Sequence, residues 1–256
     1  MSMYHADGIV LRNRDLGEAD RVVTLLCPDK GKIDAVARGA RRPRNRLVGL
    51  TLPFNLLRMS LFKGHGLDQL SQAEGIKSFQ GLRGDLTKLA CASYLAELVM
   101  EFLPEHEPNP AVFNLFVRSL ASLEQNHPPE NLLRFFELRL MDLSGFRPSL
   151  DACLACGAPW DGFDEVLFAP ADGGFYCREC AKNASVALSA VGRETLQAMR
   201  QGLAGDVHFM SNLAPPARRQ IGRIMQAFIE ARLDRELRSL RFLTGILAQD
   251  EAVNPV

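Results

Sequence analysis

Four cysteines in the second half of the chain have the spacing of a metal site. Cys153 and Cys156 form one Cys-x-x-Cys pair, Cys177 and Cys180 form a second, and 20 residues separate the pairs. Two residues between cysteines allow a tight turn in which both thiolates reach one ion, and four thiolates suit tetrahedral Zn²⁺. We therefore expect one structural zinc ion per chain. Two alternatives stay open: four packed free thiols, or a site that has lost its metal.

The sequence carries no pattern of a catalytic site. A four-thiolate zinc site has no open position for water, so the metal would be structural. The chain lacks a phosphate-binding loop, a dinucleotide fingerprint, a His-Glu-x-x-His helix and a Gly-x-Ser-x-Gly elbow. Its five histidines are scattered along the chain. We expect a protein that is not an enzyme, and an undetected active site is the least favoured alternative.

The first third of the chain contains a dense run of basic residues. Between residues 30 and 63 there are nine basic side chains and one acidic one. Guanidinium groups match phosphate oxygens and stack on bases, so we expect this run to bind nucleic acid. The candidate residues are Lys30, Lys32, Arg38, Arg41, Arg42, Arg44 and Arg46. The alternative is a solvated basic loop, or one that meets an acidic protein.

The overall composition does not reveal this uneven distribution of charge along the chain. The 256 residues include 30 basic and 30 acidic side chains, yet the first 80 hold 13 basic and eight acidic ones. Hydrophobic residues make up 47% of the chain and charged residues 23%, which excludes a disordered or fibrous protein. There is no apolar run long enough for a membrane span and no signal peptide, so we expect a cytoplasmic protein without membrane contact.

The elements that position these residues change character near residue 80. Before it, five runs of apolar and β-branched residues predict strands over 5–13, 19–27, 32–38, 51–62 and 67–72. Turns with glycine at 28–31 and 64–66 favour hairpins, and the set fits a small antiparallel barrel. Gly39 and Pro43 disfavour a helix, so the arginines should lie on a loop.

Beyond residue 80, apolar residues recur every three or four positions and predict helices. We expect helices from residue 86 to Pro104, from Pro110, from Pro129 to Gly145, from Ser189 to about Gly202, and from Pro215 through Leu237. The last eight residues should be loose. The predicted class is α+β, with a barrel domain at 1–80 and an all-helical domain at 81–256. The cysteines would lie in a zinc-ribbon insertion at about 150–185, under a two-stranded flap.

Several motifs, in this order and spacing, resemble the RecO family of bacterial recombination mediators. They are Gly17-Glu-Ala-Asp20 followed by Arg-Val-Val-Thr-Leu-Leu, Ala37-Arg-Gly-Ala-Arg41, Leu50 to Pro53-Phe54, Arg134-Phe-Phe-Glu-Leu-Arg-Leu, Ser144-Gly-Phe-Arg-Pro148 and the cysteine pairs. The resemblance implies an N-terminal five-stranded OB-fold, a helical domain and a zinc-bearing insertion.

The resemblance also implies a non-enzymatic role in DNA repair and recombination. Such a protein binds single- and double-stranded DNA, anneals complementary strands, and works with RecR and possibly RecF to load RecA onto DNA coated with single-strand-binding protein. It would be cytoplasmic and associated with the nucleoid. Arg134 matches a family position implicated in holding the acidic C-terminal tail of single-strand-binding protein. From the residues alone, an ion pair of Arg134 with Glu137 or Glu130 is an equal alternative. The competing function is a zinc-ribbon scaffold that acts mainly through protein–protein contacts.

Overall fold

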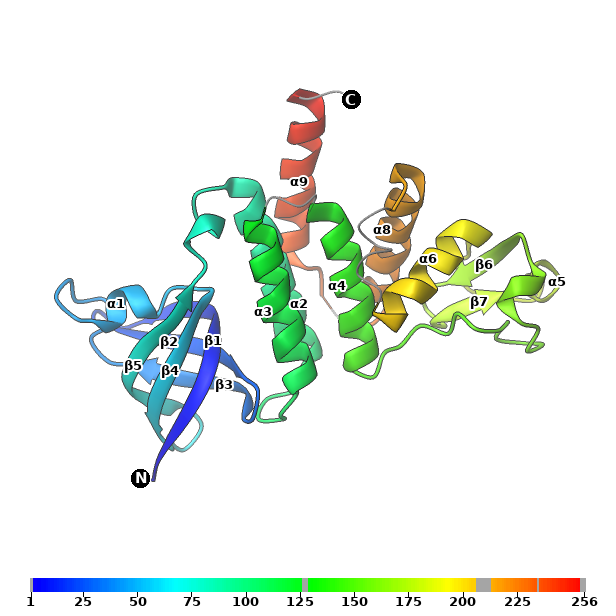
Figure 1. The fold of residues 1–256 in the computed structure, drawn as a ribbon. Coiled ribbons are helices and arrows are strands. Elements are labelled where there is room, and N and C mark those ends of the chain that lie inside the picture. Colours follow the sequence, from blue (N-terminus) through cyan, green and yellow to red (C-terminus); the bar gives the residue numbers. More distant parts are fainter. Residues whose placement is uncertain (1, 126–128, 206–212, 234, 254–256) are drawn as a thin grey trace. The chain divides into compact units, whose positions relative to one another are not determined.

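The computed structural model describes residues 2–125, 129–205, 213–233 and 235–253 and shows an α+β protein (Figure 1). The residues group into two compact units, one of Met1–Asn126 with Leu237–Val256 and one of His127–Glu236. The predicted domain boundary at residue 80 stays a prediction, because these units reflect spatial proximity alone. Within the described residues, no helix has both the length and the apolar character needed to cross a membrane.

Five strands at the start of the first unit form a closed barrel. They are β1 (Met3–Leu16), β2 (Asp20–Cys27), β3 (Gly31–Ala37), β4 (Asn55–Phe62) and β5 (Asp68–Ser78). Their order is β1-β2-β3-β5-β4, and β4 pairs back with β1. The five expected strands are present, but the pairing of β3 with β5 is parallel. The fourth strand was predicted to begin at Thr51; it begins at Asn55, because Phe54 has a φ of 69° and breaks the extended backbone.

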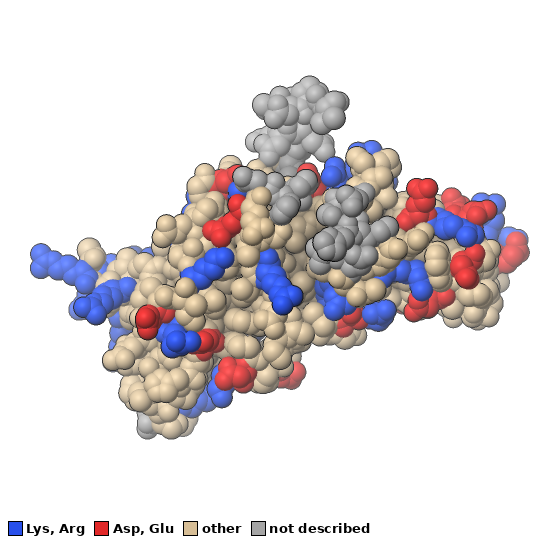
Figure 2. All heavy atoms as spheres, in the orientation of Figure 1, with Lys and Arg blue, Asp and Glu red and all other residues tan. Residues whose placement is uncertain are grey.

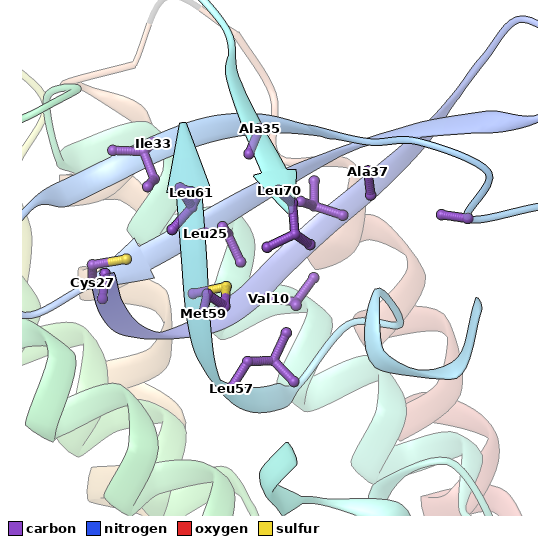
Figure 3. Close-up of a cluster of buried hydrophobic side chains, with 13 residues drawn as sticks. Val10, Leu25, Cys27, Ile33, Ala35, Ala37, Leu57, Met59, Leu61 and Leu70 are labelled. Atoms are coloured by element: carbon purple, nitrogen blue, oxygen red, sulfur yellow. The ribbon is translucent and has the colours of Figure 1, made fainter. Parts of the chain in front are cut away.

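Alternating side chains fill the inside of this barrel (Figure 3). In β3, for example, Ile33, Ala35 and Ala37 are buried while the residues between them are only partly covered. Cys27 lies in the same core, where burial raises the pKa of its thiol to about 12. Cys27 is thus a core residue of the barrel. The turn after β2 ends at Gly31, whose φ of 70° suits the predicted tight hairpin.

Three longer helices among the described residues pack in the first unit: α2 (Leu86–Phe102), α3 (Pro110–Glu124) and α9 (Arg238–Val253). Asp85 caps α2 by accepting a hydrogen bond from Lys88 N at 3.0 Å. Asn109 caps α3 in the same way, because its Oδ1 accepts a hydrogen bond from Val112 N at 3.0 Å. Helix α3 contacts β2 and α2 contacts β1. These helices therefore cover part of the outside of the barrel.

The second unit combines helices with a small sheet. Its elements are α4 (Pro129–Leu143), η2 (Trp160–Gly162), β6 (Glu165–Ala169), β7 (Gly174–Tyr176), α5 (Arg178–Ala181), β8 (Ser189–Gly192), α6 (Arg193–Ala204) and α8 (Pro215–Glu230). Helices α4, α6 and α8 contact one another, and the sheet has the order β7-β6-β8. The predicted two-stranded flap is confirmed as the hairpin of β6 and β7, whose turn spans residues 170–173.

Three predictions in this part of the chain were wrong. Ser189 does not cap a helix but lies in β8, because Val191 pairs with Val166 of β6 and is fully buried. The domain is therefore not all-helical outside the insertion at 150–185. Helix α8 ends at Glu230 instead of continuing to Leu237, and a separate helix, α9, follows. That helix reaches Val253 within the tail predicted to be loose, while residues 254–256 lie outside the described residues.

Candidate nucleic-acid interface and metal centre

The five clustered arginines lie on the loop that joins β3 to the short helix α1 (Leu47–Leu50). We call residues 38–46 the arginine loop. The backbone makes successive turns here and no strand or helix, as predicted. Figure 2 shows Lys and Arg side chains extending from the end of the barrel that carries α1.

Hydrogen bonds fix the backbone of the arginine loop. Gly39 has a φ of 69°, and its N–H donates to Asp20 Oδ1 at 2.7 Å. Asn45 spans the loop: its Nδ2 donates to the Arg38 carbonyl at 3.1 Å, and its Oδ1 accepts from Leu47 N at 2.8 Å. A Cβ on residue 39 would lie 2.6 Å from Asn45 Nδ2, so this packing needs glycine. These hydrogen bonds therefore hold the backbone of the arginine loop in a defined conformation.

One of the five arginines is part of that scaffold. Arg41 Nη1 donates to the Gly17 carbonyl at 2.6 Å, and Arg41 Nε lies 3.3 Å from Asp15 Oδ2. The other four residues are exposed, and their side chains form no ion pair or hydrogen bond with any residue that the structure describes. They are Arg38, Arg42, Arg44 and Arg46. Four positively charged side chains therefore gather at one end of the barrel without an ion-pair partner among the described residues.

The two predicted lysines lie elsewhere. Lys30 is in the β2–β3 turn, 3.9 Å from Asp29, and its Nζ lies 6.0 Å from the centre of the Tyr4 ring. Lys32 is half-buried, and its Nζ donates to the Met100 carbonyl of α2 at 2.6 Å. Burial lowers the pKa of Lys32. Both precede or begin β3, whose seven residues span roughly 20 Å, whereas the arginine loop follows its other end. The structure does not bring the lysines to the arginines.

Sequence reasoning missed the residues that hold the loop, Asp20 and Asn45. In the sequence Asp20 stands out only as part of the family motif, and Asn45 was not identified as a site residue. The signal available was an Asn in a segment that also contains the turn-forming residues Gly39 and Pro43, since asparagine side chains often bond nearby backbone groups.

The four cysteines meet in the second unit as their spacing predicted. Their Sγ atoms all lie within 4.8 Å of one another, and those of Cys156 and Cys177 are 3.9 Å apart. A tetrahedral ion with bonds of about 2.3 Å to sulfur places the sulfurs about 3.8 Å apart. The cluster therefore fits a zinc-sized ion with four thiolate ligands.

Local structure prepares these cysteines for a cation. Gly157, with a φ of 71°, turns the chain after the first pair, and its N–H donates to the Cys153 carbonyl. Burial raises the pKa of Cys153, but hydrogen bonds to its thiolate from the backbone of Cys156 and Cys177 outweigh this and lower the pKa to about 6. Hydrogen bonding to the side chains of Cys177 and Cys156 raises the pKa of Cys180 to about 12. One sulfur is thus already stabilised as the thiolate that a metal requires.

Arg134 has an internal partner. Its Nη2 donates to Glu137 Oε1 at 2.6 Å, one turn along α4. The Arg134 side chain is 17% exposed and that of Glu137 only 1%. Gly222 on α8 leaves space for the guanidinium group, because any Cβ there would collide with Nη1. This is the ion pair with Glu137 that the residues offered as the alternative to a partner-binding role.

The sequence is similar to two described families that together span both units. Residues 1–79 match the family described as "Recombination protein O N terminal", and residues 83–241 match "Recombination protein O C terminal". The arginine loop lies inside the first match and the four cysteines inside the second.

Similar proteins of known name span nearly the whole chain. DNA repair protein RecO of Symbiobacterium thermophilum is 43% identical over 249 residues, which cover 95% of this chain and 97% of the relative. DNA repair protein RecO of Anaeromyxobacter sp. strain K is 40% identical over 250 residues, or 96% and 98% of the two chains. The protein of that name from Desulforamulus reducens is 32% identical over 245 residues, or 95% and 94%.

Proposed function

The chain belongs to the RecO family of DNA repair proteins, and on this premise we propose that it binds and anneals single-stranded DNA without catalysing a chemical reaction. The observation that carries the proposal is the set of four unpartnered arginines on the rigid arginine loop. Each of them can contact a phosphate, and phosphate contacts release counterions. Two strands held at such a surface repel each other less, which favours their pairing.

The barrel topology supports assigning this unit as an OB-fold. The strand order β1-β2-β3-β5-β4 and the helix between β3 and β4 fit a five-stranded Greek-key barrel. In OB-folds, oligonucleotides bind across the second and third strands and the adjoining loops. Here the outward-facing Val22, Thr24 and Leu26 of β2 are buried, and β2 contacts α3. Because the protein's own helix covers much of that face, we place the DNA on the arginine loop at the end of the barrel.

The family supports a set of partners for this activity. We propose that the protein acts with RecR, and with RecF where present, to load RecA onto DNA coated with single-strand-binding protein. This would take place in the cytoplasm at the nucleoid. If Arg134 holds the acidic tail of single-strand-binding protein, the tail carboxylate must share the guanidinium group with Glu137, whose Oε1 already accepts from Nη2.

We assign the four cysteines a structural zinc ion. Four thiolates fill a tetrahedral coordination sphere, so no position is left for water and no Lewis-acid step at a substrate is implied. The ion would fix the turns on either side of β6 and β7 and thereby the small sheet.

The test is a titration of the full-length protein with a fluorescent single-stranded oligonucleotide at several salt concentrations. Four phosphate contacts predict a slope of log affinity against log salt of about −3, at about −0.7 per contact. Binding that weakens with salt in this way supports the proposal. Absence of binding at low salt would contradict it and favour a scaffold whose arginine loop meets an acidic protein.

A further inference from the structure

The arginine loop borders a pocket of about 660 Å³. Leu16 at the end of β1, Asp20 at the start of β2 and Val36 of β3 line it, together with Arg38 and Arg42. We propose that this pocket takes one unstacked base of the bound strand and that Asp20 favours cytosine over thymine there. The proposal rests on the DNA-binding function above and specifies which part of the DNA enters the pocket.

The charges at this pocket favour a phosphate beside the arginines and an uncharged base inside. Arg38 and Arg42 offer unpartnered guanidinium groups to phosphate. The Asp20 carboxylate lines the same pocket, so a phosphate that moved fully inside would be repelled. A base carries no charge, and its flat face can lie against the apolar side chain of Leu16, which is 40% exposed. The combination therefore suits a nucleotide with its phosphate at the arginines and its base inside.

Asp20 has one carboxylate oxygen to offer a ligand. Its Oδ1 accepts the hydrogen bond from Gly39 N at 2.7 Å. Its Oδ2 forms no hydrogen bond or ion pair with the described residues. A carboxylate only accepts hydrogen bonds. Cytosine carries an amino group, N4, where thymine carries the carbonyl oxygen O4, so cytosine donates to this oxygen and thymine repels it.

The pocket is formed before DNA arrives. The hydrogen bond from Gly39 N fixes the Asp20 carboxylate. The hydrogen bond from Asn45 Nδ2 to the Arg38 carbonyl, 3.1 Å long, fixes the backbone at Arg38. Groups that are already in position lose little conformational entropy when a ligand binds. The single free acceptor, Asp20 Oδ2, can therefore produce a difference in binding affinity between two bases.

The experiment compares labelled strands of about 20 nucleotides at low salt and neutral pH: oligo(dC), oligo(dT) and an abasic strand with the same phosphates. We expect the full-length protein to bind oligo(dC) about three- to tenfold more tightly than oligo(dT), as for the net contribution of one ordinary hydrogen bond. The abasic strand should bind more weakly than oligo(dC).

The variant Asp20→Asn keeps the oxygen that accepts from Gly39 but replaces the free acceptor with an amide that can donate. It should bind oligo(dT) at least as tightly as oligo(dC), because the amide donates to thymine O4 and no longer accepts from cytosine N4, while its melting temperature stays close to that of the wild type. The matched control is Asp29→Asn, which removes the same charge in the β2–β3 turn and should keep the preference.

Three results would overturn the inference. They are equal affinity of the wild type for all three strands, an unchanged preference in Asp20→Asn, and loss of the preference in both variants, which would indicate a general effect of charge. Each of these leaves the proposed function intact if the strands bind. Failure of every strand to bind at low salt would instead contradict the proposed function itself.

Discussion

Asn45 is hydrogen-bonded across the arginine loop to the backbone of Arg38, from Nδ2 to the carbonyl oxygen at 3.1 Å. The same side chain accepts from Leu47 N at the start of α1. A neutral residue inside a run of arginines thereby fixes both ends of the charged segment. This contact holds in place the backbone that carries the unpartnered guanidinium groups.

Replacing Asn45 with Ala should loosen the arginine loop. The variant loses two hydrogen bonds at a partly buried site, for which we expect about 1–2 kcal/mol lower stability. Amide exchange of Leu47 should become faster, and affinity for single-stranded DNA should fall several-fold because a mobile loop loses more entropy on binding. Asn109→Ala is the control: it removes the cap of α3 at a similar cost in stability, about 1 kcal/mol, but should not change DNA affinity. Equal DNA affinity of Asn45→Ala and wild type would show that the contact does not organise the site.

The cysteine cluster should hold about one zinc ion per chain in elemental analysis. Cys177→Ser removes one of four ligands and should abolish zinc retention. Because metal binding and local folding are coupled, we expect the second unit to lose roughly 3 kcal/mol or more of stability. Cys91→Ala, a change at a buried cysteine in α2, should retain the zinc. A wild type that contains no zinc as purified, or one whose melting temperature is unchanged when its zinc is removed by a chelator, would refute a structural metal.

Much of the fold could be predicted because local signals agreed with tertiary structure. The turn chemistry at Gly31, the cap at Asn109 and the pattern of apolar residues in α2 each indicate the element that the structure shows. The spacing within each Cys-x-x-Cys pair is also informative, because it limits the distance between the two sulfur atoms. These features depend on few residues that are close in sequence.

The remaining features depend on contacts between distant residues. Strand β8 forms because Val191 pairs with Val166 of β6, and nothing in its four residues alone distinguishes it from a helix start. Helix α9 begins where it does because the Glu97 carboxylate of α2 accepts hydrogen bonds from the N–H groups of Arg238 and Ser239. Lys32 belongs to the basic run in sequence, but it lies at the opposite end of β3 from the arginine loop, where its Nζ donates to the Met100 carbonyl of α2. Charge counting along a sequence cannot detect such a separation.

Removal of Arg134 should cost substantial stability whatever its role in partner binding. Arg134→Ala leaves the nearly buried Glu137 carboxylate without this cation, for which we expect about 3 kcal/mol in urea unfolding. Arg178→Ala breaks an exposed ion pair with Glu165 and should cost less than about 1 kcal/mol. Similar costs for the two variants would mean that the Arg134–Glu137 pair is not a structural element of this unit.

Glu137→Gln tests whether Arg134 also binds an acidic tail. The substitution removes the charge that competes for the guanidinium group, so a peptide with an acidic C-terminal tail should bind several-fold more tightly to the variant. Calorimetric titration of the peptide measures this directly. Identical weak or absent binding to wild type and variant would remove Arg134 from the partner site and leave it a structural role alone.

The most direct test of the central claim is the annealing rate of complementary single strands in the presence of a charge-reversed arginine loop. Arg38, Arg42 and Arg44 are changed together to Glu, and the matched control changes Lys30, Arg58 and Lys63, three exposed cations elsewhere on the barrel, in the same way. We predict that the loop variant anneals at least about tenfold more slowly than wild type, while the control variant stays within about twofold and both remain folded. Annealing that persists in the loop variant, or that is lost equally in the control, would contradict the assignment of DNA binding to this loop.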